Sequence, residues 1–225
     1  MSGTVAAELS PPSPRLKITE IFYSLQGEAD SVGFPTVFVR LTGCPLRCQF
    51  CDTAYAFQGG EWRTLDEVVA KVGEWSPRHV CVTGGEPLAQ KNCLPLLSAL
   101  TDAGYRVSLE TSGAMPIAEV DPRVIRVVDV KTPGSLEDKR NRYQDLTLLR
   151  AEEQIKFVIC GRADYEWSRA KVAELGLAHR CTVLFSPSAD QLPPRQLADW
   201  ILEDRLPVRF QLQLHKVLWG NVPGK

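Results

Sequence analysis

The chain has 225 residues and a formal net charge of -1, with acidic and basic residues mixed evenly along it. This length supports one hydrophobic core or at most two, and the charge balance argues against nucleic acid as a partner, because no basic patch is present to bind it. Seven cysteines, without a secretory signal or an apolar run near the roughly 18 residues of a membrane span, predict a cytoplasmic protein with no membrane association.

The first part of the chain is predicted to contain a leader, a strand and a turn. Residues 1–15 include Ser10-Pro-Pro-Ser-Pro14 and show no periodicity, so we predict a disordered leader there and a single domain over residues 16–225. From Leu16 to Leu25 apolar and polar residues partly alternate, which predicts a strand that delivers the turn Gln26–Glu28 to a ligand site. An ordinary surface turn is the alternative.

A buried strand follows at Thr36–Leu41, interrupted by Arg40. A buried cation is costly unless it is paired, and a guanidinium can clamp a carboxylate with two hydrogen bonds. Arg40 therefore binds either a substrate carboxylate or a carboxylate of the protein itself.

Cys44, Cys48 and Cys51 come directly after this strand, in a C-x3-C-x2-C spacing. A structural zinc site uses four closing ligands, and no second cysteine pair of that kind occurs downstream. Cysteine thiolates in compressed spacings hold iron–sulfur clusters, and three of them leave one iron of a [4Fe–4S] cluster free for a small molecule. The alternative is three cysteines without a ligand.

The rest of the chain alternates strands and helices. Thr64 and Glu67 form a capping box that opens a helix, and further helices are predicted at 92–103, 164–175 and 194–204. Strands are predicted at 79–83, 105–110, 124–131, 155–159, 181–185 and 208–214. This alternation predicts a parallel sheet. With about six strands and a reduced set of helices, the fold class is α/β, an incomplete TIM-like barrel whose ligand site lies at the carboxyl ends of the strands.

The cysteine spacing, with Phe50 before the last cysteine, resembles that of the radical S-adenosylmethionine (SAM) enzymes. Within that superfamily, the stretch from Ile18 to about Lys216 is similar to the 7-carboxy-7-deazaguanine synthase family. The segments that carry the similarity are Phe22–Glu28, Phe38–Cys44, Cys51–Thr53, Thr83–Pro87, Leu109–Gly113 and Gln213–Lys216.

The resemblance implies a role for each matching residue. Glu110 and His215 are the implied catalytic residues. The implied substrate-binding residues are Leu25, Gln26, Gly27, Glu28, Arg40 and Thr83. The implied SAM-binding residues are Phe50, Cys51, Asp52, Gly84, Gly85, Glu86, Asp129, Val130, Lys131 and Ser186. Cys44, Cys48 and Cys51 are the implied cluster ligands and Thr53 a ligand of Mg2+. At 129–131 the chain reads Asp-Val-Lys where the family is expected to have Ser-Pro-Lys.

The resemblance also implies the chemistry. Reductive cleavage of SAM gives a 5′-deoxyadenosyl radical that takes hydrogen from C6 of 6-carboxy-5,6,7,8-tetrahydropterin, whose ring contracts with loss of ammonia to 7-carboxy-7-deazaguanine, an intermediate for queuosine and other 7-deazapurines. The implied partners are a flavodoxin or ferredoxin as electron donor and a second copy in a homodimer. Three other classes remain open from the residues: another radical SAM enzyme such as a glycyl-radical activase, an iron–sulfur electron carrier, and a zinc-binding module.

Overall fold

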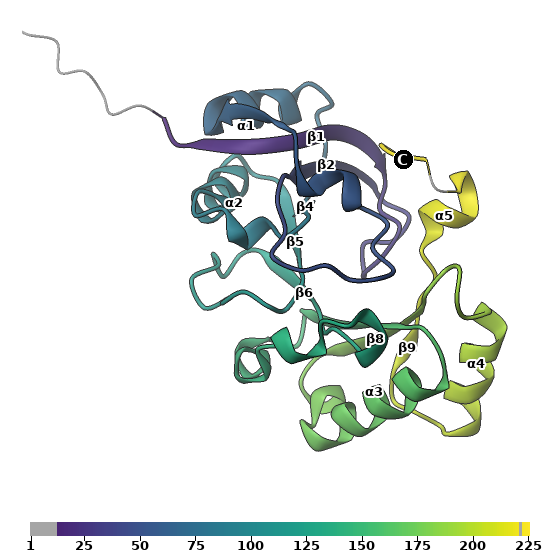
Figure 1. Ribbon diagram of the computed structural model, residues 1–225. Helices are drawn as coiled ribbons and strands as arrows, with labels where there is room; N and C mark the ends of the chain where they lie inside the picture. The colour runs from purple at the N-terminus through teal and green to yellow at the C-terminus, as the bar shows by residue number, and fades with distance from the viewer. Residues whose placement is uncertain (1–12, 221) are drawn as a thin grey trace, which may run out of the picture.

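The computed structural model describes residues 13–220 and 222–225, so most of the predicted disordered leader lies outside the described residues. Within those ranges the strands form one sheet in the order β3-β1-β2-β4-β5-β6-β7-β8-β9 (Figure 1). The strands are β1 (Arg15–Leu25), β2 (Pro35–Leu41), β3 (Glu61–Thr64), β4 (His79–Gly84), β5 (Arg106–Thr111), β6 (Ile125–Asp129), β7 (Gln154–Ile159), β8 (Thr182–Pro187) and β9 (Arg209–Phe210).

The sheet is an open, mostly parallel barrel, which confirms the predicted fold class. From β2 through β4, β5, β6, β7 and β8 to β9 each neighbouring pair is parallel, while β1 pairs antiparallel with β2 and β3. The two edges of the sheet, β3 and β9, do not pair with each other among the described residues. The edge strand β3 was not predicted, because its residues read only as the approach to a capped helix.

Four of the described helices lie on the outside of the curved sheet (Figure 1): α1 (Leu65–Gly73), α2 (Cys93–Asp102), α3 (Arg162–Glu174) and α4 (Pro194–Glu203). A fifth, α5 (Leu214–Trp219), lies apart from them and contributes residues to the cavity inside the barrel. The predicted capping box opens α1: Thr64 N donates to Glu67 Oε2 at 2.7 Å and Glu67 N donates to Thr64 Oγ1 at 3.2 Å. Between β5 and β6 the described chain has no helix, so the helix set is reduced as predicted. Each helix in the described ranges is too short or too polar to cross a lipid bilayer.

Alternate residues of β2 face the hydrophobic core and the cavity inside the barrel. Val37, Val39 and Leu41 are fully buried in the core that also contains residues of α1 and α2. Phe38 and Arg40 face the other way and line a cavity inside the barrel. A strand inside a layered fold therefore places its apolar residues against the helices and leaves its other face for the site.

The predicted strand at 208–214 is wrong beyond Phe210. Gln211 N still donates to Phe185 O of β8 at 3.0 Å, and the Gln211 side chain bonds the backbone of Ala29 twice, accepting from the amide at 2.7 Å and donating to the carbonyl at 3.0 Å. Leu214 N then donates to Gly27 O at 2.9 Å, and α5 begins. His215 consequently lies in the first turn of a helix and not at the end of a strand. At the other end of the domain, Arg15 already belongs to β1, which moves the predicted leader boundary by one residue.

Candidate functional site

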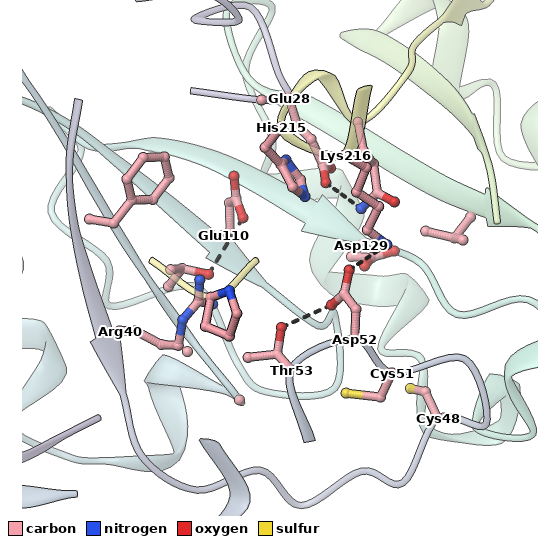
Figure 2. Close-up of a pocket in the computed structure, with 18 of the residues that line it drawn as sticks. Glu28, Arg40, Cys48, Cys51, Asp52, Thr53, Glu110, Asp129, His215 and Lys216 are labelled. Atoms are coloured by element: carbon pink, nitrogen blue, oxygen red, sulfur yellow. Dashed lines mark hydrogen bonds and ion pairs between the residues drawn. The ribbon is translucent and has the colours of Figure 1, made fainter. Parts of the chain in front are cut away.

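A cavity of about 270 Å3 opens inside the barrel, with the carboxyl ends of the parallel strands around it (Figure 2). It brings together residues from the start, middle and end of the chain. Of the residues with predicted roles, those that line it are Leu25, Gln26, Gly27, Glu28, Arg40, Cys44, Cys48, Phe50, Cys51, Asp52, Thr53, Thr83, Gly84, Gly85, Glu110, Asp129, Lys131 and His215.

The cysteine loop follows β2 and is fixed by the turn after β4. Glu86 N donates to Gly43 O at 2.8 Å, and a Cβ at Gly85 would lie 2.4 Å from that same carbonyl oxygen. Gly85 is therefore required for the two turns to pack together. From the sequence, this glycine was predicted to allow close approach to a ligand, and this contact between two turns was not predicted. All three cysteines line the cavity, and burial raises the pKa of each thiol, that of Cys48 to about 11.

Three predicted SAM-binding residues lie away from the cavity lining. Glu86 is fully buried, and its carboxylate accepts hydrogen bonds from Thr111 Oγ1 at 2.9 and 3.0 Å and from Ser112 N at 2.6 Å. It fastens the glycine turn to the end of β5. Val130 bonds through its amide to Lys156 O at 2.8 Å, and Ser186 Oγ donates to Gln211 O at 2.9 Å. The structure thus gives each of the three a place in the scaffold around the site.

Arg40 pairs with a carboxylate of the protein. Its Nε donates to Glu20 Oε1 at 2.7 Å, and the Tyr55 hydroxyl donates to the same oxygen at 2.8 Å. The guanidinium carbon lies 5.8 Å from the ring centre of Phe22 and 5.9 Å from that of Tyr55. Among the described residues only Nε has a hydrogen-bond partner, so the two terminal nitrogens are left for a ligand.

A buried ion pair occupies one wall of the cavity. The ammonium of Lys156, in the middle of β7, lies 2.5 Å from Glu28 Oε2 and 3.8 Å from Asp129 Oδ2, and Gln213 Nε2 donates to Glu28 Oε1 at 2.8 Å. Burial alone would raise the pKa of Glu28, but the charge and hydrogen bond of Lys156, the hydrogen bond from Gln213 and the influence of His215 together outweigh burial and lower it. Lys156 was missed in the sequence, although a cation inside an apolar strand is the same signal that drew attention to Arg40.

Glu110 ends in the same cavity, where Gln26 Nε2 donates to it at 3.2 Å and Thr83 Oγ1 donates to it at 3.4 Å. Burial raises the pKa of Glu110, and the nearby negative charge of Glu28 raises it further. Two carboxylates with opposite shifts stand side by side, which is an arrangement typical of functional sites.

His215 lies against the turn predicted to bind substrate (Figure 2). A Cβ at Gly27 would be 2.2 Å from His215 Nδ1, so only glycine leaves room for this ring. Burial lowers the pKa of His215, and the imidazole is neutral near pH 7.

The residue after His215 reaches the cysteine loop. Lys216 Nζ lies 2.7 Å from Asp52 Oδ2, and Thr53 Oγ1 donates to Asp52 Oδ1 at 2.9 Å. Burial alone would raise the pKa of Asp52, but Lys216 and Thr53 lower it to about 2. Lys216 lies in a segment that carries the family similarity, but no role was predicted for it. Its position on the short helix α5 lets it pair with Asp52 of the cysteine loop.

Comparisons with known proteins agree with this geometry. The Radical SAM superfamily sequence model matches residues 38–128. The chain is 46% identical over 208 residues to the 7-carboxy-7-deazaguanine synthase of Chlorobaculum tepidum, covering 91% of this chain and 94% of that protein. It is 42% identical to the protein of the same name from Koribacter versatilis, covering 91% and 97%. The chain belongs to the 7-carboxy-7-deazaguanine synthase family. A crystal structure of QueE from Escherichia coli has a similar fold, with a TM-score of 0.69 and 25% identity, covering 89% of this chain and 95% of that one.

A member of the 7-carboxy-7-deazaguanine synthase family uses a [4Fe–4S] cluster and SAM, and the site fits both. Three thiols line one cavity, and the buried ammonium of Lys131 lies near enough to lower the pKa of all three against the effect of burial. Asp129 Oδ1 is buried with no hydrogen-bond partner among the described residues, which leaves an acceptor for the donors of a ligand. The described side chains contain no group of three or more His, Cys, Asp or Glu already gathered as a metal site.

Proposed function

We propose that the protein converts 6-carboxy-5,6,7,8-tetrahydropterin to 7-carboxy-7-deazaguanine with loss of ammonia. The observation that carries this proposal is the single cavity in which the cysteine loop meets the turn Gln26–Glu28, Arg40, Glu110 and His215. A small polar substrate with a carboxylate and several N–H groups matches the guanidinium of Arg40, the carboxylates of Glu28 and Glu110 and the imidazole of His215 in this lining.

Each wall of the cavity has a proposed task. The terminal nitrogens of Arg40 bind the substrate carboxylate, with Glu20 holding the guanidinium in place through Nε. Glu28, Gln26 and Glu110 accept or donate hydrogen bonds at the N–H edge of the pterin, Leu25 and Gly27 shape that wall, and Thr83 supports Glu110. His215 lies against Gly27, where its neutral ring can move or accept a proton at a nitrogen of the substrate.

The cysteine end of the cavity is proposed to hold the cofactors. Cys44, Cys48 and Cys51 would bind the cluster, which would supply a binding position for SAM and the electron for its cleavage. Phe50, Asp52, Gly84, Gly85, Asp129 and Lys131 line the space beside them, and Asp129 Oδ1 offers the free acceptor. Glu86, Val130 and Ser186 support this wall from behind it. The walls keep a reactive intermediate away from water.

Mg2+ is proposed at Thr53, because a hydroxyl beside the ionised carboxylate of Asp52 offers the oxygen ligands that this ion prefers. We also propose a homodimer in the cytoplasm that receives its electron from a flavodoxin or ferredoxin. These partners agree with a family of enzymes that depend on an external reductant.

The activity is tested with anaerobically reconstituted protein, SAM, a reductant and the carboxytetrahydropterin. The expected result is 7-carboxy-7-deazaguanine, recognised by its ultraviolet spectrum and mass, with SAM regenerated and not consumed in proportion to product. A reconstituted protein that binds SAM but leaves this pterin unchanged would refute the proposed substrate. Retention of zinc without iron or labile sulfide would refute the radical chemistry altogether.

A further inference from the structure

Lys156 holds a central position that the proposed roles do not use. Its ammonium is surrounded by three carboxylates from three segments: Glu28 after β1, Glu110 at the end of β5 and Asp129 at the end of β6. The side chain is about one tenth exposed, and its backbone is paired with both neighbouring strands, opposite Asp129 on β6 and Leu184 on β8. A residue fixed on both sides in a sheet cannot easily move away from these charges.

The two cavity lysines, Lys131 and Lys156, make their shortest ion pairs with different carboxylates. Lys131 Nζ already pairs with Asp129 Oδ2 at 2.8 Å, so Asp129 keeps a cation even without Lys156. Glu28 has no second cation: the other described groups facing it are the neutral donor Gln213, the imidazole of His215 and the like charge of Glu110. Removing Lys156 would therefore leave Glu28, at the substrate end of the cavity, without a cation, while the Lys131–Asp129 pair at the SAM end would remain.

We propose that Lys156 is a positioning residue that holds Glu28 ionised and oriented for the substrate, and that it acts on substrate binding separately from SAM binding. This inference rests on the proposed function, because it assigns Glu28 to the pterin edge. An ionised carboxylate accepts hydrogen bonds from the N–H groups of that edge, whereas a protonated one would present a donor to them. Without the ammonium, Glu28 and Glu110 become two buried carboxylates that cannot both be ionised readily.

The test compares reconstituted holoenzymes: wild type, K156M, E28Q, E28Q/K156M, and the control K171M, which removes a lysine from an exposed ion pair on α3. KM for the carboxytetrahydropterin, KM for SAM and kcat are measured from pH 6 to pH 8. K156M should raise KM for the pterin about tenfold or more, because it leaves the buried carboxylate of Glu28 without its cation, and should change KM for SAM less than twofold.

The pH dependence separates positioning from a general structural role. In the wild type Glu28 stays ionised over this range and adds no pH dependence to KM for the pterin. In K156M, KM for the pterin should rise more steeply than in the wild type as the pH falls, because Glu28 takes up a proton. The titratable groups around the Glu28–Lys156 pair are Glu110, Asp129 and His215, and the comparison with the wild type removes their common contribution. A KM for the pterin that stays at the wild-type value, or equal losses in both substrates, would overturn the proposal.

The double variant gives a second test, because it is compared with E28Q and both proteins lack the Glu28 charge. If Lys156 acts through Glu28, E28Q/K156M should have the same KM for the pterin as E28Q, since the charge to be held is gone. A further tenfold loss in the double variant would refute the inference. Inactive wild type and K171M would instead refute the proposed function, so the two failures are distinguishable.

Discussion

Replacing Gly27 with alanine tests the contact that joins the first turn of the site to its last helix. The added Cβ would lie 2.2 Å from His215 Nδ1 and 3.1 Å from the His215 amide nitrogen, whereas ordinary contact begins near 3.4 Å. The imidazole must therefore withdraw by about 1.2 Å. It cannot do so freely, because Leu214 N is bonded to the Gly27 carbonyl at 2.9 Å.

A displacement of about 1 Å in a catalytic group can cost about a hundredfold in rate, which corresponds to about 2.7 kcal/mol of activation free energy. We expect G27A to lower kcat by roughly that factor while the reconstituted protein still binds its cluster. The assay is anaerobic turnover of the carboxytetrahydropterin, with iron content and thermal melting measured in parallel.

The matched control is G161A. Gly161 precedes α3 with extended backbone, φ 179°, and a Cβ there meets no atom within 4 Å, so its activity should be that of the wild type. H215A and G27A/H215A complete the cycle: if the clash with the ring is the cause, alanine at 27 should add little once the ring is gone. Wild-type kcat in G27A, or a double variant much worse than H215A, would refute the reasoning.

Three further results are expected. R40A should raise KM for the pterin more than thirtyfold, a loss of about 2–5 kcal/mol for a buried charged contact, with KM for SAM unchanged; equal loss of both would contradict its role. E110Q should melt at a higher temperature than the wild type at pH 7, because the raised pKa of Glu110 gives stability below its unfolded value of 4.5 that is lost as the pH rises through the folded value. This advantage should disappear in acid, and a lower melting temperature at pH 7 would show that the charge is favourable. C48A should reconstitute with less iron and lose activity, and a fully active C48A would rule out the cluster assignment.

The parts of the site that the sequence predicted are those where the chemistry is local. Three cysteines in eight positions after a strand need no tertiary information, and neither does Glu110 at the end of an alternating strand. Arg40 was singled out because a cation interrupts a buried run; the structure adds Glu20 as its partner across the β1–β2 ladder, and its role toward a substrate stays a prediction.

The parts that were missed depend on distant partners. Glu86 looked like a ligand residue from its motif, yet the hydroxyl of Thr111 and the amide of Ser112, 25 and 26 residues away, use its carboxylate. The segment at 208–214 has a strand pattern, but the strand covers only Arg209–Phe210, and the chain beyond it is held to the first turn of the site by the bonds of Gln211 to Ala29 and of Leu214 to Gly27. These contacts are tertiary, and periodicity carries no information about them.

The hydrogen bonds between the turn after β1 and the segment leading into α5 span about 185 residues, as between Gln213 and Glu28. Contacts of such long sequence separation carry a high loop-closure cost, which slows folding. During synthesis the cysteine loop would emerge well before the wall that faces it. Cluster insertion into a nascent or partly folded chain would thus meet a pocket without its His215 side, exposed to solvent and oxygen.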